Sequence, residues 1–327
     1  MKALVTGGHG FIGSFLVERL LKEGFHVRCL VRKSSNLQWL KGLQQVELCY
    51  GDLTTPKSLP AACQGVEIIY HIAGTLTGAN LDRYFSVNTQ GTIDLLKATV
   101  QVAPNLKRFV FVSSVAAIGP SNHFQVSDET TPCQPVSIYG KSKLEAEKDL
   151  IQNFSHIPYT IIRPTIVYGP RDQHFLTFFK FAKRGIFPVP HPYERYYSII
   201  HVSDLVDGIF QASQNERAVG QTYVMCNPEY YSFETMAQKL AAPFQNNPKF
   251  IPVPKFAIKL IGVAGDLHQW WTKKETMFNS QKLPEVTAAA WVYTPQKAMD
   301  ELGFKIQTSL EEGARQTVAW YQKHKYL

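Results

Sequence analysis

The chain has 327 residues, of which 45% are apolar, and a formal net charge of +8. A chain of this length and composition buries a large core, which excludes a disordered protein and predicts either two domains or one domain with an elaborated lobe. Its basic residues are dispersed and accompany no zinc-finger, helix-turn-helix or RNA-binding pattern, so we expect no nucleic-acid partner.

Strand-like apolar runs alternate with helical segments through the first half of the chain. The strand candidates are residues 2–6, 26–31, 46–50, 67–71, 108–113 and 159–163, and the helix candidates between them are 11–24, 56–63, 81–100 and 137–150. Near-continuous apolar strands separated by helices indicate a parallel sheet that is covered on both faces. The predicted fold class is therefore α/β, a doubly wound parallel sheet of the Rossmann type, with ligands at the carboxyl ends of its strands.

The first strand and the first helix are joined by a loop with regularly spaced glycines, Gly7, Gly10 and Gly13. One glycine permits a tight turn, the next lets the backbone approach a pyrophosphate, and the third lets the helix pack closely on the strand. The position of the motif, between a strand and an amphipathic helix, is typical of a dinucleotide-binding loop.

The second strand ends without the acidic residue that bonds the ribose 2′-hydroxyl in NAD-preferring enzymes. Val31 occupies that place, and Arg32 and Lys33 follow it. Cations at this position favour a 2′-phosphate, so we expect NADP(H) to be preferred, with NAD(H) as the alternative. The two residues could instead be solvated loop cations.

Asp52 follows the third strand and has two interpretations. Its carboxylate could accept a hydrogen bond from the adenine amino group of a cofactor. It could equally serve a turn before the helix that begins at Pro56.

Tyr139 and Lys143 are four residues apart near the start of a predicted helix. Positions i and i+4 share one face of a helix, so both polar groups can reach the same point outside it. Such a pair is either part of an active site or simply a tyrosine beside a solvated lysine.

After residue 163 the pattern is less regular. A stretch rich in proline and aromatic residues (170–198) precedes a segment (197–212) that reads as a strand and a capped helix, with Ser203 or Asp204 as the cap. Residues 222–226 predict one more strand. Further on, Gly303 is expected to end a helix, and Ser309 with Glu312 to form a capping box for the last one.

This pattern predicts a division into two parts. Residues 1–163 and 199–226 are expected to form the cofactor-binding domain, and residues 164–198 and 227–327 a smaller, mostly helical lobe for substrate.

Nine short motifs follow one another in a single order along the chain. They are TGGHGFIG (6–13), GDLT (51–54), HIAG (71–74), NTQGT (88–92), FVSSVAAIG (111–119), YGKSK (139–143), RPTIVYGP (163–170), HVSDLVDGI (201–209) and ELGFKIQTSLEEG (301–313). Over nearly the whole chain this set resembles the extended short-chain dehydrogenase/reductases, the NAD(P)-dependent epimerase/dehydratase superfamily. In pattern it is most similar to the branch of dihydroflavonol reductases and 3β-hydroxysteroid dehydrogenases.

The resemblance implies catalytic roles for four residues. Tyr139 would be the general acid/base, and Lys143 would lower the pKa of Tyr139 and bond the nicotinamide ribose. Ser114 stands 25 residues before the tyrosine and would hydrogen-bond the reacting oxygen, with Ser113 the less favoured candidate. Asn88 would hold a water that links Lys143 to solvent, or would make only a local backbone bond.

The resemblance also implies a set of binding residues and no metal ligands. The expected cofactor contacts are Gly7, Gly10, Phe11, Ile12, Gly13, Arg32, Lys33, Asp52, Leu53, Ala73, Gly74, Tyr139, Lys143, Pro164, Ile166 and Val167. The expected substrate contacts are Thr75, Tyr168, Arg171, Phe175, Tyr193 and Arg195.

Two departures from the sugar-nucleotide enzymes of the superfamily bear on the substrate. Those enzymes often carry Asn where this chain has Ile166, and the 4,6-dehydratases carry an Asp-Glu pair where it has Val115 and Ala116. Both differences remove polar chemistry, which favours an oxidoreductase acting on a hydrophobic alcohol/ketone pair. A sugar-nucleotide epimerase is the alternative, because Arg171 or Arg195 could grip a diphosphate. A cofactor-sensing regulatory protein is the third reading.

Eight aromatic residues stand between Arg171 and Ile200. They could line a pocket for a flat apolar substrate, or they could form the core of the smaller lobe. The eight are Phe175, Phe178, Phe179, Phe181, Phe187, Tyr193, Tyr196 and Tyr197.

The remaining features bear on location and partners. The five cysteines are far apart and form no Cys-x-x-Cys pair, so we expect a reducing, cytoplasmic location, and no secretion signal is evident at the start. Residues 255–271 are the most membrane-like stretch but are interrupted by Lys259 and Asp266, so they predict a core or interfacial helix and no stable span. We expect a small-molecule substrate, and a homodimer on the resemblance alone.

Overall fold

A seven-stranded parallel sheet forms the centre of the protein in the computed structural model, which describes residues 1–76, 81–122, 125–190, 194–272 and 280–327. Its strands are β1 (Lys2–Thr6), β2 (His26–Val31), β3 (Val46–Tyr50), β4 (Ile68–His71), β5 (Arg108–Val112), β6 (Tyr159–Pro164) and β10 (Gln221–Met225). They lie in the order β10-β6-β5-β4-β1-β2-β3, and every pairing is parallel. The predicted strands are confirmed to within about one residue at each end.

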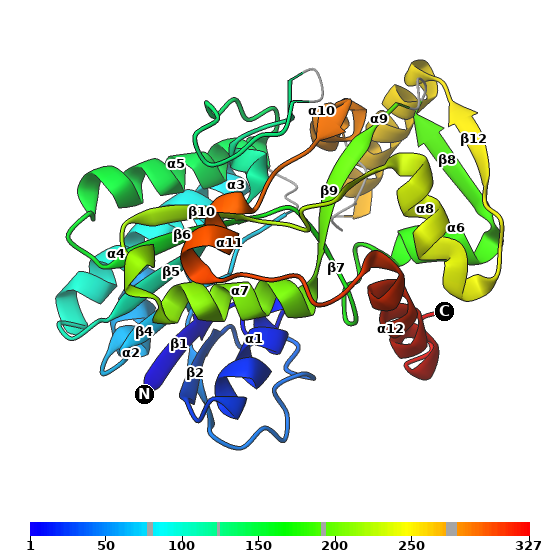
Figure 1. The fold of residues 1–327 in the computed structure, drawn as a ribbon. Coiled ribbons are helices and arrows are strands. Elements are labelled where there is room, and N and C mark those ends of the chain that lie inside the picture. Colours follow the sequence, from blue (N-terminus) through cyan, green and yellow to red (C-terminus); the bar gives the residue numbers. More distant parts are fainter. Residues whose placement is uncertain (77–80, 123–124, 191–193, 273–279) are drawn as a thin grey trace.

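Helices cover both faces of this sheet (Figure 1). One face carries α1 (Phe11–Lys22), α7 (Val202–Gln214) and α11 (Gln296–Leu302), and the other carries α2 (Leu59–Cys63), α4 (Gly91–Val102) and α5 (Ile138–Asn153). The central strands are buried on both faces, with Leu4 and Val5 of β1 facing separate core clusters. This arrangement explains the near-continuous apolar runs and confirms the doubly wound fold.

The segment predicted as one helix over residues 81–100 is divided. It consists of α3 (Leu81–Tyr84), a π-helical turn (Phe85–Gln90) and α4. π-Helical turns are rare and concentrate at functional sites. This one places Asn88 in the interior of the protein.

The smaller lobe combines helices with short strands. Its helices are α6 (Leu176–Arg184), α8 (Phe233–Ala241), α9 (Lys255–Thr272), α10 (Leu283–Thr287) and α12 (Leu310–Lys323), and its strands are β7 (Ile166–Tyr168), β8 (Ile186–Pro190), β9 (Tyr196–His201), β11 (Tyr230–Ser232), β12 (Lys249–Val253) and β13 (Ala290–Trp291). Strand β9 pairs with β7, β11 and β13, and β8 pairs with β12. The lobe is mainly helical, as predicted.

The segment 199–226 divides between the two parts. Helix α7 and strand β10 lie with the large sheet, whereas β9 pairs only in the small one. The domain boundaries remain a prediction.

Three helix ends were predicted from sequence; the one at Gly303 is confirmed, and the capping box at Ser309 is confirmed for its serine side chain. Gly303 ends α11 in a left-handed conformation (φ 71°), and the Ser309 hydroxyl accepts a hydrogen bond from the Glu312 amide at the start of α12. The cap of α7 is neither Ser203 nor Asp204, because the His201 side chain accepts the bond from the Ser203 amide. Asp204 instead accepts bonds from the backbone amides of residues 307 and 308, which fixes the C-terminal segment to α7.

Five of the aromatic residues between Arg171 and Ile200 form the core of the lobe. Phe178 stacks on Phe175, with ring centroids 4.9 Å apart, and lies 4.7 Å from Phe187. Phe179 and Phe181 belong to the same packing clusters. The sequence left two interpretations open, and for these five residues the core interpretation is correct.

Two further findings concern the described residues only. No helix among them is long and apolar enough to cross a membrane. No group of three metal-ligating side chains occurs in the same ranges.

Candidate active site

The glycine loop between β1 and α1 has the geometry that the sequence predicts. Gly7 has a φ of +74°, and a Cβ atom there would lie 2.9 Å from the amide nitrogen of Ala73. A Cβ atom at Gly13 would lie 2.1 Å from the Gly7 carbonyl oxygen. No side chain caps α1, whose N-cap is Gly10, and its first turn has no acidic residue. The first amide groups of α1 are therefore suited to bind an anion such as a pyrophosphate.

Basic side chains stand beside this loop. Arg32 and Lys33 are exposed where β2 ends. His9 lies between the glycines. Burial lowers the pKa of His9, and the positive charge of the nearby Arg32 lowers it further. Its Nδ1 atom is buried and has no hydrogen-bond partner among the described residues. Sequence reasoning missed His9, and its position inside the glycine motif was the available signal.

Asp52 is engaged in a turn. Its Oδ1 atom accepts hydrogen bonds from the amide and the hydroxyl of Thr54, both at 2.9 Å. The adjacent Leu53 is buried, with its Cβ atom packed against Gly91. The turn interpretation of Asp52 is thus observed, and the adenine contact remains a prediction for the second carboxylate oxygen.

Close backbone packing brings Tyr139 and Ser114 together. Helix α5 begins at Ile138, with the Ser137 hydroxyl accepting a bond from the Gly140 amide at 3.0 Å. A Cβ atom at Gly140 would lie 2.1 Å from the carbonyl oxygen of Ala116, so only glycine lets α5 approach the turn after β5. The Tyr139 hydroxyl consequently interacts with the Ser114 side chain.

The pKa of Tyr139 is raised above its usual value. Burial is the main cause, the Glu285 carboxylate adds to it, and the Ser114 interaction acts in the opposite direction. This direction differs from the expectation that Lys143 lowers the pKa. The Lys143 ammonium instead donates a hydrogen bond to the Val112 carbonyl at 2.8 Å.

Lys143 is almost completely buried, with 2% of its surface exposed. Its Nζ atom lies 4.5 Å from the centroid of the Phe111 ring. Burial lowers the pKa of Lys143 to about 8, although the Glu147 carboxylate acts in the opposite direction. Glu147 is itself held by Arg163 in a buried ion pair of 2.6 Å. The ammonium is therefore poorly compensated and available to interact with a polar ligand.

Asn88 joins three parts of the site. Its Oδ1 accepts a bond from the Thr75 amide at 2.7 Å, and its Nδ2 donates to the Thr75 carbonyl and the Ser142 hydroxyl. A Cβ atom at Gly74 would lie 3.2 Å from Asn88 Oδ1 and 3.7 Å from Lys143 Nζ. The side chain thus holds the loop after β4 beside Lys143. The water relay remains a prediction.

The ends of β5 and β6 each contribute one buried hydroxyl to this region. Pro164 ends β6, and Ile166 and Val167 are half-buried in β7. The side-chain oxygens of Thr165 and Ser113 are buried and lack partners among the described residues. Thr165 was missed by sequence reasoning, although it is the one polar residue in the motif's PTIV segment.

The two arginines expected to contact substrate are engaged elsewhere. Arg171 donates to the Ser14 hydroxyl at 3.0 Å and to the Glu18 carboxylate at 2.6 Å, so it fixes the loop after β7 to α1. Arg195 donates to two backbone carbonyls, those of residues 286 and 288. These contacts remove the reason for expecting either guanidinium to grip a diphosphate.

The aromatic substrate candidates are also placed differently from expectation. Tyr168 is buried in the lobe core, where its ring lies 6.1 Å from that of Phe175. Tyr193 lies outside the described residues. The substrate contacts, including the one expected at Thr75, remain a prediction.

Glu285 of α10 is a further candidate that sequence reasoning missed. A small cavity is lined by Tyr84, Ser137, Ile138, Tyr139, Lys282 and Glu285. The Ser137 hydroxyl donates a hydrogen bond to Glu285, across 148 residues of sequence. No local pattern could have signalled this pairing. The lobe thereby places a carboxylate beside the candidate general acid.

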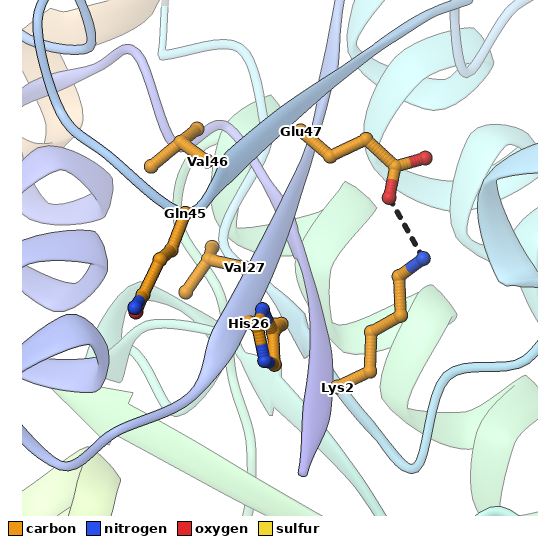
Figure 2. Close-up of a pocket in the computed structure, with 6 residues that line it drawn as sticks. All are labelled: Lys2, His26, Val27, Gln45, Val46 and Glu47. Carbon is orange, nitrogen blue, oxygen red and sulfur yellow. Dashed lines mark ion pairs between the residues drawn. The ribbon is translucent and has the colours of Figure 1, made fainter.

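A separate surface hollow of about 310 Å³ lies at the amino-terminal ends of the strands, away from the carboxyl ends where the candidate site lies. Figure 2 shows it at the amino-terminal ends of β1, β2 and β3, with Lys2 paired to Glu47 at 2.7 Å. In doubly wound folds, ligands bind at the carboxyl ends of the strands. This hollow is therefore not our candidate site.

The model of the NAD dependent epimerase/dehydratase family matches residues 3–226. Among curated relatives, the chain is 28% identical to the ceramide reductase of Caulobacter vibrioides, covering 99% of this chain and 95% of that protein. It is also 28% identical to the UDP-glucose 4-epimerase of Vibrio cholerae, covering 96% and 93%. The 3-beta-hydroxysteroid dehydrogenase of Mycolicibacterium neoaurum is 34% identical over 53% of this chain and 49% of that protein.

Solved structures show the same fold. The UDP-glucose 4-epimerase of Thermus thermophilus, in complex with NAD, superposes with a TM-score of 0.79. It is 22% identical and covers 98% of this chain and 99% of that one.

Proposed function

Because the chain belongs to the NAD dependent epimerase/dehydratase family, we propose that it is an NADP(H)-preferring oxidoreductase that interconverts a hydrophobic alcohol and its ketone. The observation that carries the proposal is the meeting of Ser114, Tyr139 and Lys143 at the carboxyl edge of the sheet. The glycine loop opens at the same edge. In the proposed reaction these residues would supply a proton donor, a hydrogen-bond donor and a cation.

The residues of the chain suit the protein's share of such a reaction, and the bound cofactor would supply or accept the hydride. The Ser114 oxygen accepts a bond from the Ala116 amide at 3.1 Å and interacts with the Tyr139 hydroxyl, and its hydroxyl would donate a hydrogen bond to the reacting oxygen. Tyr139 would transfer its proton to that oxygen during reduction and recover it during oxidation. Lys143, whose Nζ atom lies next to Gly74, would donate a hydrogen bond to the nicotinamide ribose of the bound cofactor.

An apolar substrate is supported by the residues that flank this chemistry. Val115 and Ala116 are buried directly after Ser114, and Ile166 is half-buried in β7. The relatives reported above include a reductase and an epimerase, both 28% identical to this chain, so identity does not discriminate between the two activities. A sugar-nucleotide epimerase is the second candidate function, because the similarity to the UDP-glucose 4-epimerase covers 96% of this chain.

Incubation with NADPH and a panel of ketones tests the proposal directly. We expect NADPH oxidation with a bulky apolar ketone, such as a sterol ketone or a ketone with a long acyl chain. NADPH binding without turnover of any ketone or sugar nucleotide would instead support a cofactor-sensing protein. A cytoplasmic location and a homodimeric state are further predictions, and light scattering tests the second.

Sugar nucleotides should not bind. We expect UDP-glucose and dTDP-glucose to leave the melting temperature unchanged, because the polar residues that contact such ligands are replaced at positions 115, 116 and 166. A ligand at 100 times its Kd would stabilise the protein by about 2.7 kcal/mol, which thermal scanning resolves. NADPH serves as the positive control. A clear rise with UDP-glucose would favour the epimerase.

NADPH should bind more tightly than NADH, and Arg32→Ala should remove most of that preference. Loss of a charge-assisted contact with the 2′-phosphate should cost about 1 to 3 kcal/mol of NADPH binding, with little effect on NADH. Fluorescence titration with both cofactors measures this difference. Arg217→Ala, which removes another exposed arginine, is the matched control. Equal affinities in the parent protein would contradict the cofactor assignment.

A further inference from the structure

Helix α9 carries a line of exposed apolar side chains. Phe256, Leu260, Val263 and Trp271 are 67%, 62%, 51% and 83% exposed. Their spacing of four, three and eight residues places all four on one face of the helix. Single exposed apolar residues are ordinary on protein surfaces, whereas a contiguous stripe marks an interaction site. We refer to these four residues as the α9 face.

The opposite side of α9 is packed against the protein. Ile258 is buried, and a Cβ atom at Gly262 would lie 3.0 Å from the side chain of Leu283 in α10. The amide of Ser280 donates a hydrogen bond to Asp266 at 3.2 Å. Gly262 and Asp266 therefore help to hold α9 against the protein, while the four large apolar residues of the α9 face point outward. In an ordinary surface helix, the large apolar residues face the core.

The segment of the sequence that contains α9 is rich in basic residues. Residues 249–282 contain six lysines and only two acidic residues, Asp266 and Glu275. Lys249 and Lys259 are exposed, and Lys259 stands next to Leu260 at the margin of the stripe. An apolar face with a basic margin and a terminal tryptophan is typical of a helix that lies in the headgroup region of an anionic bilayer.

We propose that the α9 face docks on the surface of an anionic lipid bilayer, with the helix axis parallel to the membrane. None of the described helices meets the requirements for a membrane span, so α9 would lie in the interface. A second copy of the chain is the less suitable occupant, because it would bring two positively charged segments together.

The packed side of α9, opposite the α9 face, is connected to the candidate active site through one intervening helix. Figure 1 shows α10 beside α9, and Leu283 of α10 contacts Gly262. Two residues further along α10, Glu285 lines the cavity next to Tyr139. Docking would therefore bring the site close to the bilayer, where an apolar substrate is concentrated. This consequence rests on the proposed function, whereas the docking itself does not.

Vesicle sedimentation of the full chain tests the docking. We expect binding to vesicles of equal parts phosphatidylglycerol and phosphatidylcholine at least roughly tenfold stronger than to phosphatidylcholine alone, and a loss of binding in high salt. Trp271 is almost fully exposed, so tryptophan emission should shift to shorter wavelength on binding.

Matched variants locate the surface. Val263→Glu and Leu260→Glu should weaken vesicle binding by roughly tenfold or more, since each places a charge in the docking face. Val100→Glu on α4 is the control, because Val100 is 50% exposed and Val263 is 51% exposed. NADPH affinity should be the same in all three variants, which separates this test from that of the proposed function.

Three results would overturn the docking proposal. The parent protein could fail to bind anionic vesicles, or Val263→Glu could bind as the parent does while retaining NADPH affinity. Alternatively, light scattering could show a dimer that Leu260→Glu converts to a monomer, which would assign the α9 face to a second copy.

Discussion

Replacing Tyr139 with phenylalanine should lower the turnover number by about 10² to 10⁴-fold while leaving the fold intact. The ring keeps its packing in the first turn of α5, and only the hydroxyl that interacts with Ser114 is removed. NADPH affinity should change little, because the remaining cofactor contacts are untouched. The measurement is a steady-state rate with the identified ketone, together with NADPH titration of the same preparation.

A second buried tyrosine provides the control. The Tyr70 hydroxyl of β4 shares a hydrogen bond of 2.7 Å with the Ser213 hydroxyl, on the other side of the sheet from α5. Tyr70→Phe should cost about 1 kcal/mol of folding free energy and leave turnover within a few-fold of the parent. If Tyr139→Phe retains more than about a tenth of the parent rate, Tyr139 is not the proton donor. Such a loss in rate is smaller than the smallest loss expected when a general acid is removed.

Local patterns sufficed for the large sheet and its glycine loop. The central strands are buried on both faces, so their residues form nearly continuous apolar runs whose ends are visible in sequence. At Gly7, Gly13 and Gly140 the backbone lies too close to another backbone segment for a Cβ atom, so these positions require glycine. A required glycine can be read directly from the sequence. The family motifs are built from such positions, which is why the order of the motifs predicted the fold.

Long-range contacts could not be predicted in the same way. Nothing near Arg171 in the sequence indicates that its guanidinium meets Glu18, 153 residues earlier. Glu285 reaches Ser137 only because α10 folds over the start of α5. The apolar residues of α9 were visible in sequence, but periodicity alone cannot say which face of a helix is turned outward.

Lys143→Met should stabilise the protein in the absence of cofactor and impair its function. Burial lowers the pKa of Lys143 to about 8 in the folded state, from an ordinary value of 10.5. The unfolded chain therefore holds this proton more tightly, so the charged side chain destabilises the fold at pH 7. Methionine removes that cost, which we put at about 1 to 3 kcal/mol after loss of the hydrogen bond to Val112.

The pH dependence of stability follows from the sign of the shift. Below pH 8 the lysine is protonated in both states, and its full cost is present. Between pH 8 and 10.5 the folded protein releases the proton before the unfolded chain does, so the stability contributed by this residue rises with pH. Urea denaturation at pH 7 and pH 10 should therefore show a larger advantage of Lys143→Met at pH 7 than at pH 10.

The same substitution should weaken NADPH binding and slow turnover, because the cation beside Gly74 is lost. Lys141→Met is the matched control, since Lys141 lies on the same helix with an exposed side chain and should alter neither stability nor binding appreciably. If Lys143 only fills the core, Lys143→Met should be more stable than the parent and bind the cofactor with unchanged affinity. If the charge of Lys143 only stabilises the fold, Lys143→Met should be less stable than the parent at both pH values. Only a lysine kept charged for a ligand predicts gain of stability and loss of binding together.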